Sequence, residues 1–198
     1  MKETKSLEWQ RVASEPGPEL IIFRSRFDQM RNPANGKTFR RVVLESVDWV
    51  NVVAVTEDDR IVMVEQYRFG IGRNTIETPG GMVDPGETSR QAAVRELEEE
   101  TGYTGGRLSY LGAVEPNPAI HDNLCHHWLV EGVVRTRAPD PGEGEALAVH
   151  LMTLDEIVAA LDSGRLRHVL ALSALSRVFT LWRPPYAVAG LEKTRTSR

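Results

Sequence analysis

Three glutamates occupy neighbouring positions with a spacing that could bind a divalent cation. Glu96, Glu99 and Glu100 lie within residues 88–101, and at about 100° per residue their side chains share one face of a helix. They fall near the C-terminal end of that helix, where its dipole is negative, and Glu96 and Glu100 form a like-charged pair four residues apart. A cation would reverse both unfavourable effects. Carboxylate oxygens are ligands suited to Mg²⁺ or Mn²⁺.

A solvated acidic helix face is the simpler alternative for such a cluster. The helix itself is well specified, because residues 88–91 match a capping box and Gly102 is a natural stop. On this helix we expect Val94, Leu97 and Thr101 to form the face that packs on the core. The glutamates then lie on a neighbouring face, which is open to solvent or to a ligand.

A second pair of carboxylates stands in a glycine-flanked loop. Glu143 and Glu145 alternate with Gly142 and Gly144, so the loop can move and bring a free carboxylate to a bound ligand. A carboxylate held by a metal is a poor proton acceptor, because the ion lowers its pKa. We therefore expect the general base that activates water in this loop rather than on the helix. An ordinary acidic surface loop is the alternative.

Four other side chains are of types that can bind ligands or react. Arg68 ends an apolar strand and offers paired donors to phosphate, with a surface salt bridge as the alternative. His126 and His127 are adjacent on an expected strand and point to opposite faces, so they cannot easily share one metal. Cys125 has no evident thiol-activating partner, which favours a structural role.

The elements that must position these residues follow from composition and periodicity. Runs rich in β-branched and aromatic residues, separated by glycine- and proline-containing turns, predict strands. We expect strands at residues 7–13, 19–27, 39–47, 50–56, 60–67, 107–115, 125–135 and 145–152, and helices at residues 88–101, 154–162 and 166–182. The first three strands form a small antiparallel sheet, and the next two form a hairpin with a buried centre.

Composition limits the class of protein. The 198 residues include 24 Lys and Arg against 28 Asp and Glu, and the net charge of −4 argues against nonspecific binding to a nucleic-acid backbone. A single cysteine cannot form an internal disulfide and fits a reducing compartment. No apolar run is long enough to span a membrane. We expect a cytoplasmic protein with a small-molecule ligand, no nucleic-acid partner and no membrane association.

The segment that begins at Gly81, GMVDPGETSRQAAVRELEEETGY, resembles the signature of the Nudix hydrolases at every fixed position. That signature is Gly, five residues, Glu, seven residues, and then Arg-Glu-apolar-any-Glu-Glu-any-Gly-apolar. At average residue frequencies, a chance match at all of these positions is very improbable. The matching residues are Gly81, Glu87, Arg95, Glu96, Leu97, Glu99, Glu100, Gly102 and Tyr103.

The resemblance implies a set of metal ligands. Glu96 and Glu100 would be the principal ligands, and Glu99 would bind a second ion or its water. A backbone carbonyl at the junction of loop and helix also reaches the metal in this family, and the matching position is Gly80. Mg²⁺ is the implied cofactor, with Mn²⁺ as a substitute.

The resemblance also implies roles around these ligands. Arg95 would orient a glutamate, and Glu87 would brace the loop or bind metal through water. In the acidic loop after the helix, Glu143 corresponds in position to the general base and Glu145 to an additional metal ligand. The resemblance also implies a catalytic role for Glu99.

Flanking residues resemble the ADP-ribose and nucleoside-diphosphate-sugar pyrophosphatases within that family. Before the signature these enzymes carry a Gln-aromatic-Arg triplet and a Glu-x-Pro-x-Gly loop, matched here by Gln66-Tyr67-Arg68 and by residues 77–81. They also carry a proline downstream of the signature, where Pro118 stands. The resemblance implies that Tyr67, Arg68, Glu77 and Pro118 contact substrate. His121-Asp122-Asn123 departs from the loop of the ADP-ribose specialists, which leaves the sugar open.

The implied fold is α/β, a Nudix α/β/α sandwich around a mixed β-sheet over residues 48–182. Residues 1–47 would add a small N-terminal antiparallel sheet, which mediates dimerisation in the resembling subgroup, and residues 183–198 a polar tail. We expect a homodimer that hydrolyses the diphosphate bond of a nucleoside-diphosphate sugar, such as ADP-ribose or GDP-mannose, to a nucleoside monophosphate and a sugar phosphate. The alternatives are a hydrolase of free nucleotides or dinucleotides and a Nudix-like ligand sensor without catalysis.

Overall fold

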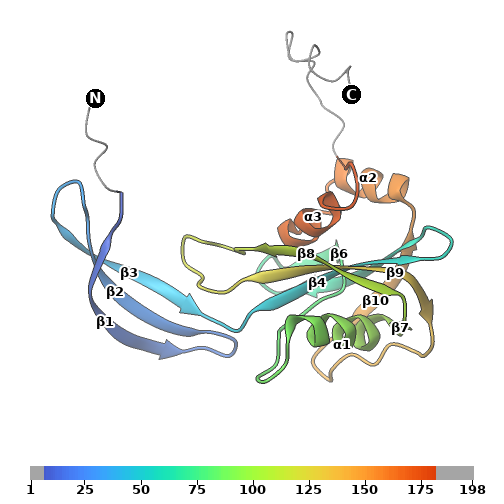
Figure 1. Ribbon diagram of the computed structural model, residues 1–198, viewed down its shortest axis with the longest axis horizontal. Coiled ribbons are helices and arrows are strands. Elements are labelled where there is room, and N and C mark those ends of the chain that lie inside the picture. Colours follow the sequence, from blue (N-terminus) through green and yellow to red (C-terminus); the bar gives the residue numbers. More distant parts are fainter. Residues whose placement is uncertain (1–6, 182–198) are drawn as a thin grey trace, which may run out of the picture.

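The computed structural model describes residues 7–181, which form a layered α/β structure with a smaller sheet at the N-terminal end (Figure 1). The strands are β1 (Gln10–Glu19), β2 (Arg24–Arg31), β3 (Thr38–Glu45), β4 (Trp49–Thr56), β5 (Ile61–Arg68), β6 (Arg73–Glu77), β7 (Tyr103–Thr104), β8 (Arg107–Val114), β9 (Cys125–Arg135) and β10 (Leu147–Met152). The helices are α1 (Ser89–Thr101), α2 (Leu154–Asp162) and α3 (Val169–Ser176).

The central sheet has seven strands and is mixed. Its main path runs β10-β5-β4-β9-β7, with β6 paired to β5 and β8 paired to β9. Strands β4 and β9 run parallel, starting with Trp49 opposite Cys125, and the other pairs are antiparallel. Together with the separate antiparallel sheet β1-β2-β3, this architecture confirms the predicted fold class.

Strand β4 is buried on both faces, and its apolar residues divide between two cores. Val50 and Val52 pack in the core that contains Leu97 of α1, whereas Val53 packs in the core that contains Ile157 of α2 and Leu175 of α3. Figure 1 accordingly shows α1 on one side of the sheet and α2 and α3 on the other. The helices therefore hold the sheet from both faces.

Helix α1 begins and ends where the sequence predicts. The hydroxyl oxygen of Thr88 accepts a hydrogen bond from the backbone N–H of Gln91, and the Gln91 side chain accepts one from the backbone N–H of Thr88. At the other end, Gly102 adopts a left-handed φ of +74°, and its N–H donates to the carbonyl of Glu98. Both ends of the helix are thus fixed by local hydrogen bonds.

Leu97 and Thr101 lie on the buried face of α1, as predicted, but Val94 does not. Val94 is 48% exposed and does not belong to the core, contrary to the prediction. The buried positions are Ala92, Ala93, Leu97, Glu100 and Thr101. Two small alanines share the buried face with Glu100, whose carboxylate accepts a hydrogen bond from the backbone N–H of Gly80.

The three-stranded sheet has no apolar core of its own. Across residues 10–45, all of which the structure describes, Ser25 and Asp28 are the two buried residues, and both are polar. Asp28 accepts hydrogen bonds from the Ser14 hydroxyl over 2.6 Å and from Arg26 Nε over 3.2 Å. A sheet with a polar centre needs another surface for its apolar residues.

The turn between β1 and β2 is joined to the central domain beside the start of β4. The rings of Phe23, Trp49 and His121 contact one another, with centroids 5.1 to 6.3 Å apart. Nearby, the backbone N–H of Leu44 donates to the carbonyl of Ile120 over 2.7 Å. The N-terminal sheet of this chain therefore reaches its own central domain at one end.

Some elements differ from the prediction. Strand β1 runs through Pro16 and Gly17, which predicted a turn, because an edge strand with irregular register tolerates proline. Strands β6 and β7 were not predicted, and α3 is shorter than residues 166–182. Within residues 7–181 no helix is long and apolar enough to cross a membrane. The predicted tail at residues 183–198 lies outside the described residues.

Replacing Gly102 by alanine should destabilise the protein more than the same change at Gly105. Both glycines have left-handed φ values, +74° and +77°, so alanine is strained at both by about 1 kcal/mol. At Gly102 an added Cβ would also collide with the carbonyl of Arg137, whereas at Gly105 it would meet open space. Urea unfolding should show an extra loss for Gly102→Ala of more than about 1 kcal/mol. Equal losses would contradict the close contact at the end of α1.

Candidate active site

The carboxylates on the last two turns of α1 lie in a poorly solvated place. Glu100 is 3% exposed and the Glu96 side chain is mostly buried, whereas Glu99 is more open. The backbone N–H of Gly80 donates to Glu100 Oε2 over 2.8 Å. Burial raises the pKa of Glu100 to about 8, against that hydrogen bond and with help from the charges of Glu96 and Glu145. The pKa of Glu96 is also raised, first by burial.

Two glycines let the preceding loop approach both β4 and α1. The carbonyls on either side of Gly80 accept hydrogen bonds from the backbone N–H groups of Val50 and Val52, each over 2.8 Å. Gly80 has a φ of +155°, and a Cβ there would collide with the carbonyl of Val50; a Cβ on Gly81 would overlap the carboxylate of Glu96. The Gly80 carbonyl accepts no hydrogen bond from residues 7–181, so it is available to a ligand.

Arg95 joins this loop to the glutamates of the helix. Its guanidinium donates twice to Glu87, over 3.1 and 2.9 Å, and to the carbonyl of Met82 over 2.9 Å. It also donates to Glu96 over 2.9 Å and to Glu99 over 3.1 Å. Arg95 thus joins two predicted metal ligands and the loop in a single hydrogen-bond network. A residue that orients a glutamate, the role predicted for Arg95, needs contacts of this kind.

The oxygen donors fit a hard divalent cation, although the side chains must move to hold one. Glu96, Glu99 and Glu145 line one cavity, and burial first and the charge of Glu145 after it raise the pKa values of Glu96 and Glu100. In their present positions no three carboxylate, imidazole or thiol groups within residues 7–181 surround a single point closely enough to hold an ion. The hydrogen bonds from Arg95 are one reason for this spacing of the carboxylates, because they occupy oxygens that would otherwise bind an ion.

Arg68 is a cation close to these carboxylates, and Glu77 fixes its position. Arg68 Nε donates to Glu77 Oε1 over 2.8 Å and Nη2 donates to Oε2 over 2.5 Å, and the Thr75 hydroxyl also donates to Glu77. Glu77 is fully buried. Burial works to raise the pKa of Glu77, but the hydrogen bond from Arg68 and the charge of His168 bring it below its usual value. Arg68 Nη1 has no partner among residues 7–181 and can still meet a ligand.

Two cavities adjoin these groups. The Arg68 cavity, of about 310 Å³, lies between the start of β4, the glycine loop and α3; its lining includes Trp49, Asn51, Arg68, Gly80, Gly81 and His168. The glutamate cavity, of about 840 Å³, lies between α1 and the loop before β10; its lining includes Phe69, Arg95, Glu96, Glu99, Gly144 and Glu145. Ile22, in the turn between β1 and β2, lines both cavities.

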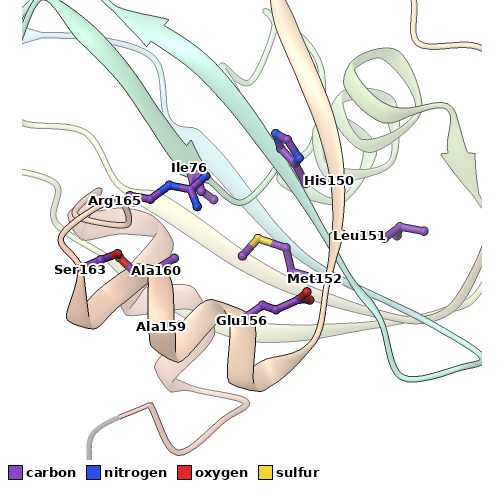
Figure 2. Close-up of a pocket in the computed structure, with 9 residues that line it drawn as sticks. All are labelled: Ile76, His150, Leu151, Met152, Glu156, Ala159, Ala160, Ser163 and Arg165. Atoms are coloured by element: carbon purple, nitrogen blue, oxygen red, sulfur yellow. The ribbon is translucent and has the colours of Figure 1, made fainter.

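A third cavity, of about 540 Å³, lies between β10 and α2 (Figure 2). Its polar lining residues include His150, Glu156 and Arg165, and His150 Nε2 lies 3.1 Å from Glu65 Oε2 on the neighbouring strand. No residue of the glutamate signature lines it. Although it is larger than the Arg68 cavity, it lacks the chemical groups that the glutamate helix provides.

Of the predicted site residues, Glu77 and Glu100 are buried and line neither cavity, and three exposed ones also lie outside both. Glu143 is exposed and lines neither cavity, in contrast to Glu145. Tyr67 is half-exposed and packs edge-on against Phe69, with ring centroids 5.4 Å apart. Pro118 is exposed in the turn that precedes β9. Contact of these residues with substrate stays a prediction that needs movement of a loop or a second chain.

Sequence reasoning missed His168 and Ile22. His168 fell inside a predicted helix, whereas it is the residue that caps the start of α3 and lines the Arg68 cavity. Ile22 was assigned to a strand, and it lies in a turn. No local pattern marks either residue, because each reaches the site through the packing of distant elements.

The adjacent histidines have the opposite orientations that were predicted. His126 Nε2 lies 3.0 Å from Asp48 Oδ2, whereas His127 Nε2 lies 3.1 Å from the Ser173 hydroxyl on α3. Cys125 is buried, and burial raises the pKa of its thiol to about 12. A thiol that stays protonated at neutral pH is a poor nucleophile, which agrees with a structural role.

Known proteins share this sequence pattern over most of the chain. Residues 47–172 match the NUDIX domain family. The chain is 32% identical over 160 residues to the ADP-ribose pyrophosphatase of Bacillus subtilis (strain 168), which covers 80% of this chain and 86% of that protein. It is also 32% identical over 165 residues to the methanol dehydrogenase activator of Bacillus methanolicus, which covers 83% of this chain and 86% of that protein.

A solved structure described as an ADP compounds hydrolase has the same fold. Its TM-score is 0.76 at 21% sequence identity, over 88% of this chain and 95% of that one. At this identity the likeness concerns the fold alone, whereas the family match and the two relatives concern the sequence. The chain belongs to the Nudix hydrolase family.

Proposed function

We propose that the chain hydrolyses the diphosphate bond of a nucleoside-diphosphate sugar, such as ADP-ribose or GDP-mannose. The observation that carries the proposal is the convergence of Glu96, Glu100 and Glu145 near Arg68, at a loop whose Gly80 carbonyl is open to a ligand. Carboxylates alone would repel a diphosphate, whereas carboxylates that hold a dication would attract it. The name of the Bacillus subtilis relative supports this substrate class, and the name of the Bacillus methanolicus relative leaves the sugar open.

Mg²⁺, with Mn²⁺ as a substitute, would be held by Glu96, Glu100 and the carbonyl of Gly80, with Glu99 and Glu145 close by. A bound divalent ion neutralises charge on the diphosphate and lowers the pKa of bound water. The buried carboxylates suit this task, because a dication offsets both the burial and the mutual repulsion that raise their pKa values.

The chain's own side chains would bind the substrate, orient the reacting groups and accept a proton. Arg68, fixed by Glu77, would bind a phosphate oxygen through its free Nη1 without reorganisation. Arg95 would keep the helix and the glycine loop in register. A carboxylate of the loop at residues 142–145 would accept the proton of the attacking water; Glu143 is the predicted base, and the loop would have to move to bring it in.

A substrate panel tests the proposal. ADP-ribose, GDP-mannose, ADP-glucose, UDP-glucose, dinucleotides and free nucleoside triphosphates should be assayed with Mg²⁺ for the release of nucleoside monophosphate. At least one diphosphate sugar should be hydrolysed with the highest kcat/KM, and EDTA should abolish the reaction. Preference for triphosphates or dinucleotides would favour the alternative hydrolase, and no turnover of any compound would favour a ligand sensor.

The variants Glu143→Gln and Glu145→Gln should have different effects on kcat and on the Mg²⁺ requirement. Glu143→Gln removes the predicted base and should lower kcat by about 10²- to 10⁴-fold, with little change in the Mg²⁺ requirement. Glu145→Gln should raise the Mg²⁺ concentration for half-maximal rate, because Glu145 lies among the carboxylates. Exposed Glu57 gives the control, and Glu57→Gln should change neither quantity. If both loop variants behave like Glu57→Gln, the base must be sought at Glu99 or His121.

Without metal, Glu100→Gln should be more stable than the wild type at high pH. The folded-state pKa of about 8 lies above the ordinary glutamate value of 4.5, so the stability of the wild type falls as pH rises from about 4.5 to 8. Glutamine keeps an acceptor for the N–H of Gly80 and has no such loss. Thermal unfolding in EDTA should show a gap on the order of 1–3 kcal/mol at pH 8.5 that narrows at pH 5. A gap that does not change with pH would show that the carboxylate is not destabilised by burial.

Residues 1–47 are proposed to form a dimer interface in a cytoplasmic homodimer, and a single buried cysteine is compatible with that compartment. The N-terminal sheet lacks an apolar core, and several of its apolar side chains are exposed, among them Trp9, Val12 and Val42. Light scattering at micromolar concentration should give the mass of two chains, and a variant with Val12→Lys and Val42→Lys should lower it. A one-chain mass for the wild type would rule out this assembly.

A further inference from the structure

His168 lines the Arg68 cavity and takes no part in the reaction proposed above. It is the N-cap of α3, where its Nδ1 accepts a hydrogen bond from the backbone N–H of Ala171 over 3.4 Å. The same Nδ1 lies 3.5 Å from Glu77 Oε2. Burial lowers the pKa of His168, with the charge of Arg68 acting in the same direction and the charge of Glu77 against it.

His168 Nε2 carries a proton when the neutral ring accepts the hydrogen bond from Ala171 at Nδ1, and also when the ring is protonated and Nδ1–H faces Glu77. A neutral imidazole that accepts a hydrogen bond at Nδ1 has its proton on Nε2. The Nε2 of His168 has no partner among residues 7–181, where the contacts of this ring are those with Ala171 and Glu77. The Nε2–H group is consequently a donor without a partner on a ring that lines the cavity.

Arg68 contributes a second open donor to the same cavity. Its Nε and Nη2 are engaged by Glu77, and its Nη1 is free of partners among the described residues. Among the residues that line this cavity, all within the described range, there is no carboxylate. Two open donors and no acidic lining group favour an oxygen with negative charge, such as a phosphate oxygen.

We propose that His168 binds substrate, with Nε2–H donating to a phosphate oxygen of the nucleotide that Arg68 also contacts. The inference rests on the proposed function and adds a specificity-determining residue to it. A helix cap alone does not require histidine, because asparagine is a stronger N-cap. What histidine adds at this position is the distal donor on the cavity wall.

Asparagine and glutamine separate the two roles of His168. Asparagine places an acceptor near the position of Nδ1 and can cap the helix, but it has no donor near Nε2. Glutamine places a donor near the position of Nε2, but it is a poor cap. The two variants therefore remove opposite parts of the same side chain.

In steady-state assays with the best substrate of the panel, His168→Asn should lower kcat/KM by about 10- to 100-fold, the usual effect of losing one hydrogen bond to a charged group. The loss should come mostly from KM, and the melting temperature should not fall. His168→Gln should keep kcat/KM within about threefold of the wild type, while its melting temperature drops by about 2–4 °C. If His168→Asn keeps wild-type kcat/KM, His168 is a helix cap and the proposal is wrong.

Equilibrium binding tests the same residue without turnover. By calorimetry with the full chain, His168→Asn should weaken ADP binding about 10-fold or more and leave adenosine binding unchanged. Equal weakening of both ligands would place the donor on the nucleoside and contradict the phosphate contact. If the wild type hydrolyses no compound of the panel, the proposed function fails, and the comparison of ADP with adenosine still decides the role of His168.

Discussion

The burial of carboxylates beneath a glycine loop is the constraint on which the rest of the site depends. Glu100 is almost inaccessible to water, and within residues 7–181 its carboxylate has one hydrogen bond, from the backbone N–H of Gly80, to offset that burial. A buried carboxylate with so little compensation holds a proton or needs a positive charge nearby. The charge of Arg68 partly meets this requirement at Glu100, and Arg95 pairs with Glu96 and Glu99 on the same helix.

The surrounding elements serve that arrangement. Ala92 and Ala93 share the buried face of α1 with Glu100. Glycine at positions 80 and 81 is required because a Cβ at either would collide with β4 or with Glu96. Strand β6 then places Glu77 behind Arg68, so that the cation stays fixed in the absence of ligand. A preorganised cation of this kind costs little reorganisation when a phosphate arrives.

Local patterns predicted the elements whose ends are set by nearby residues. The capping box at Thr88 and the stop at Gly102 marked the ends of α1, and two apolar runs on either side of a short acidic turn predicted the hairpin of β4 and β5. The buried face of α1 was mispredicted at Val94, because alanines carry little weight in a hydrophobic pattern although they allow close packing. Strand β6 was missed because its sequence, RNTIE, is mostly polar and its pairing with β5 depends on tertiary context.

The site residues likewise fall into those that a local sequence pattern marks and those that only the folded structure brings together. The signature and its spacing led to the glutamates of α1, whereas the hydrogen bonds of Arg95, the pairing of Arg68 with Glu77 and the position of His168 emerge only when distant elements come together. That residues 68 and 168 line one cavity has no signal in a single sequence.

Direct titration with Mn²⁺, followed by electron paramagnetic resonance of the free ion, is the most direct test of the central claim that the α1 carboxylates form a cation site. The wild type should bind Mn²⁺ without substrate, Glu100→Gln should bind at least tenfold more weakly, and Mg²⁺ should compete. Glu98→Gln is the matched control, because Glu98 lies on the same helix and pairs with Arg137 instead. Equal Mn²⁺ affinity in the wild type and in Glu100→Gln would contradict the account.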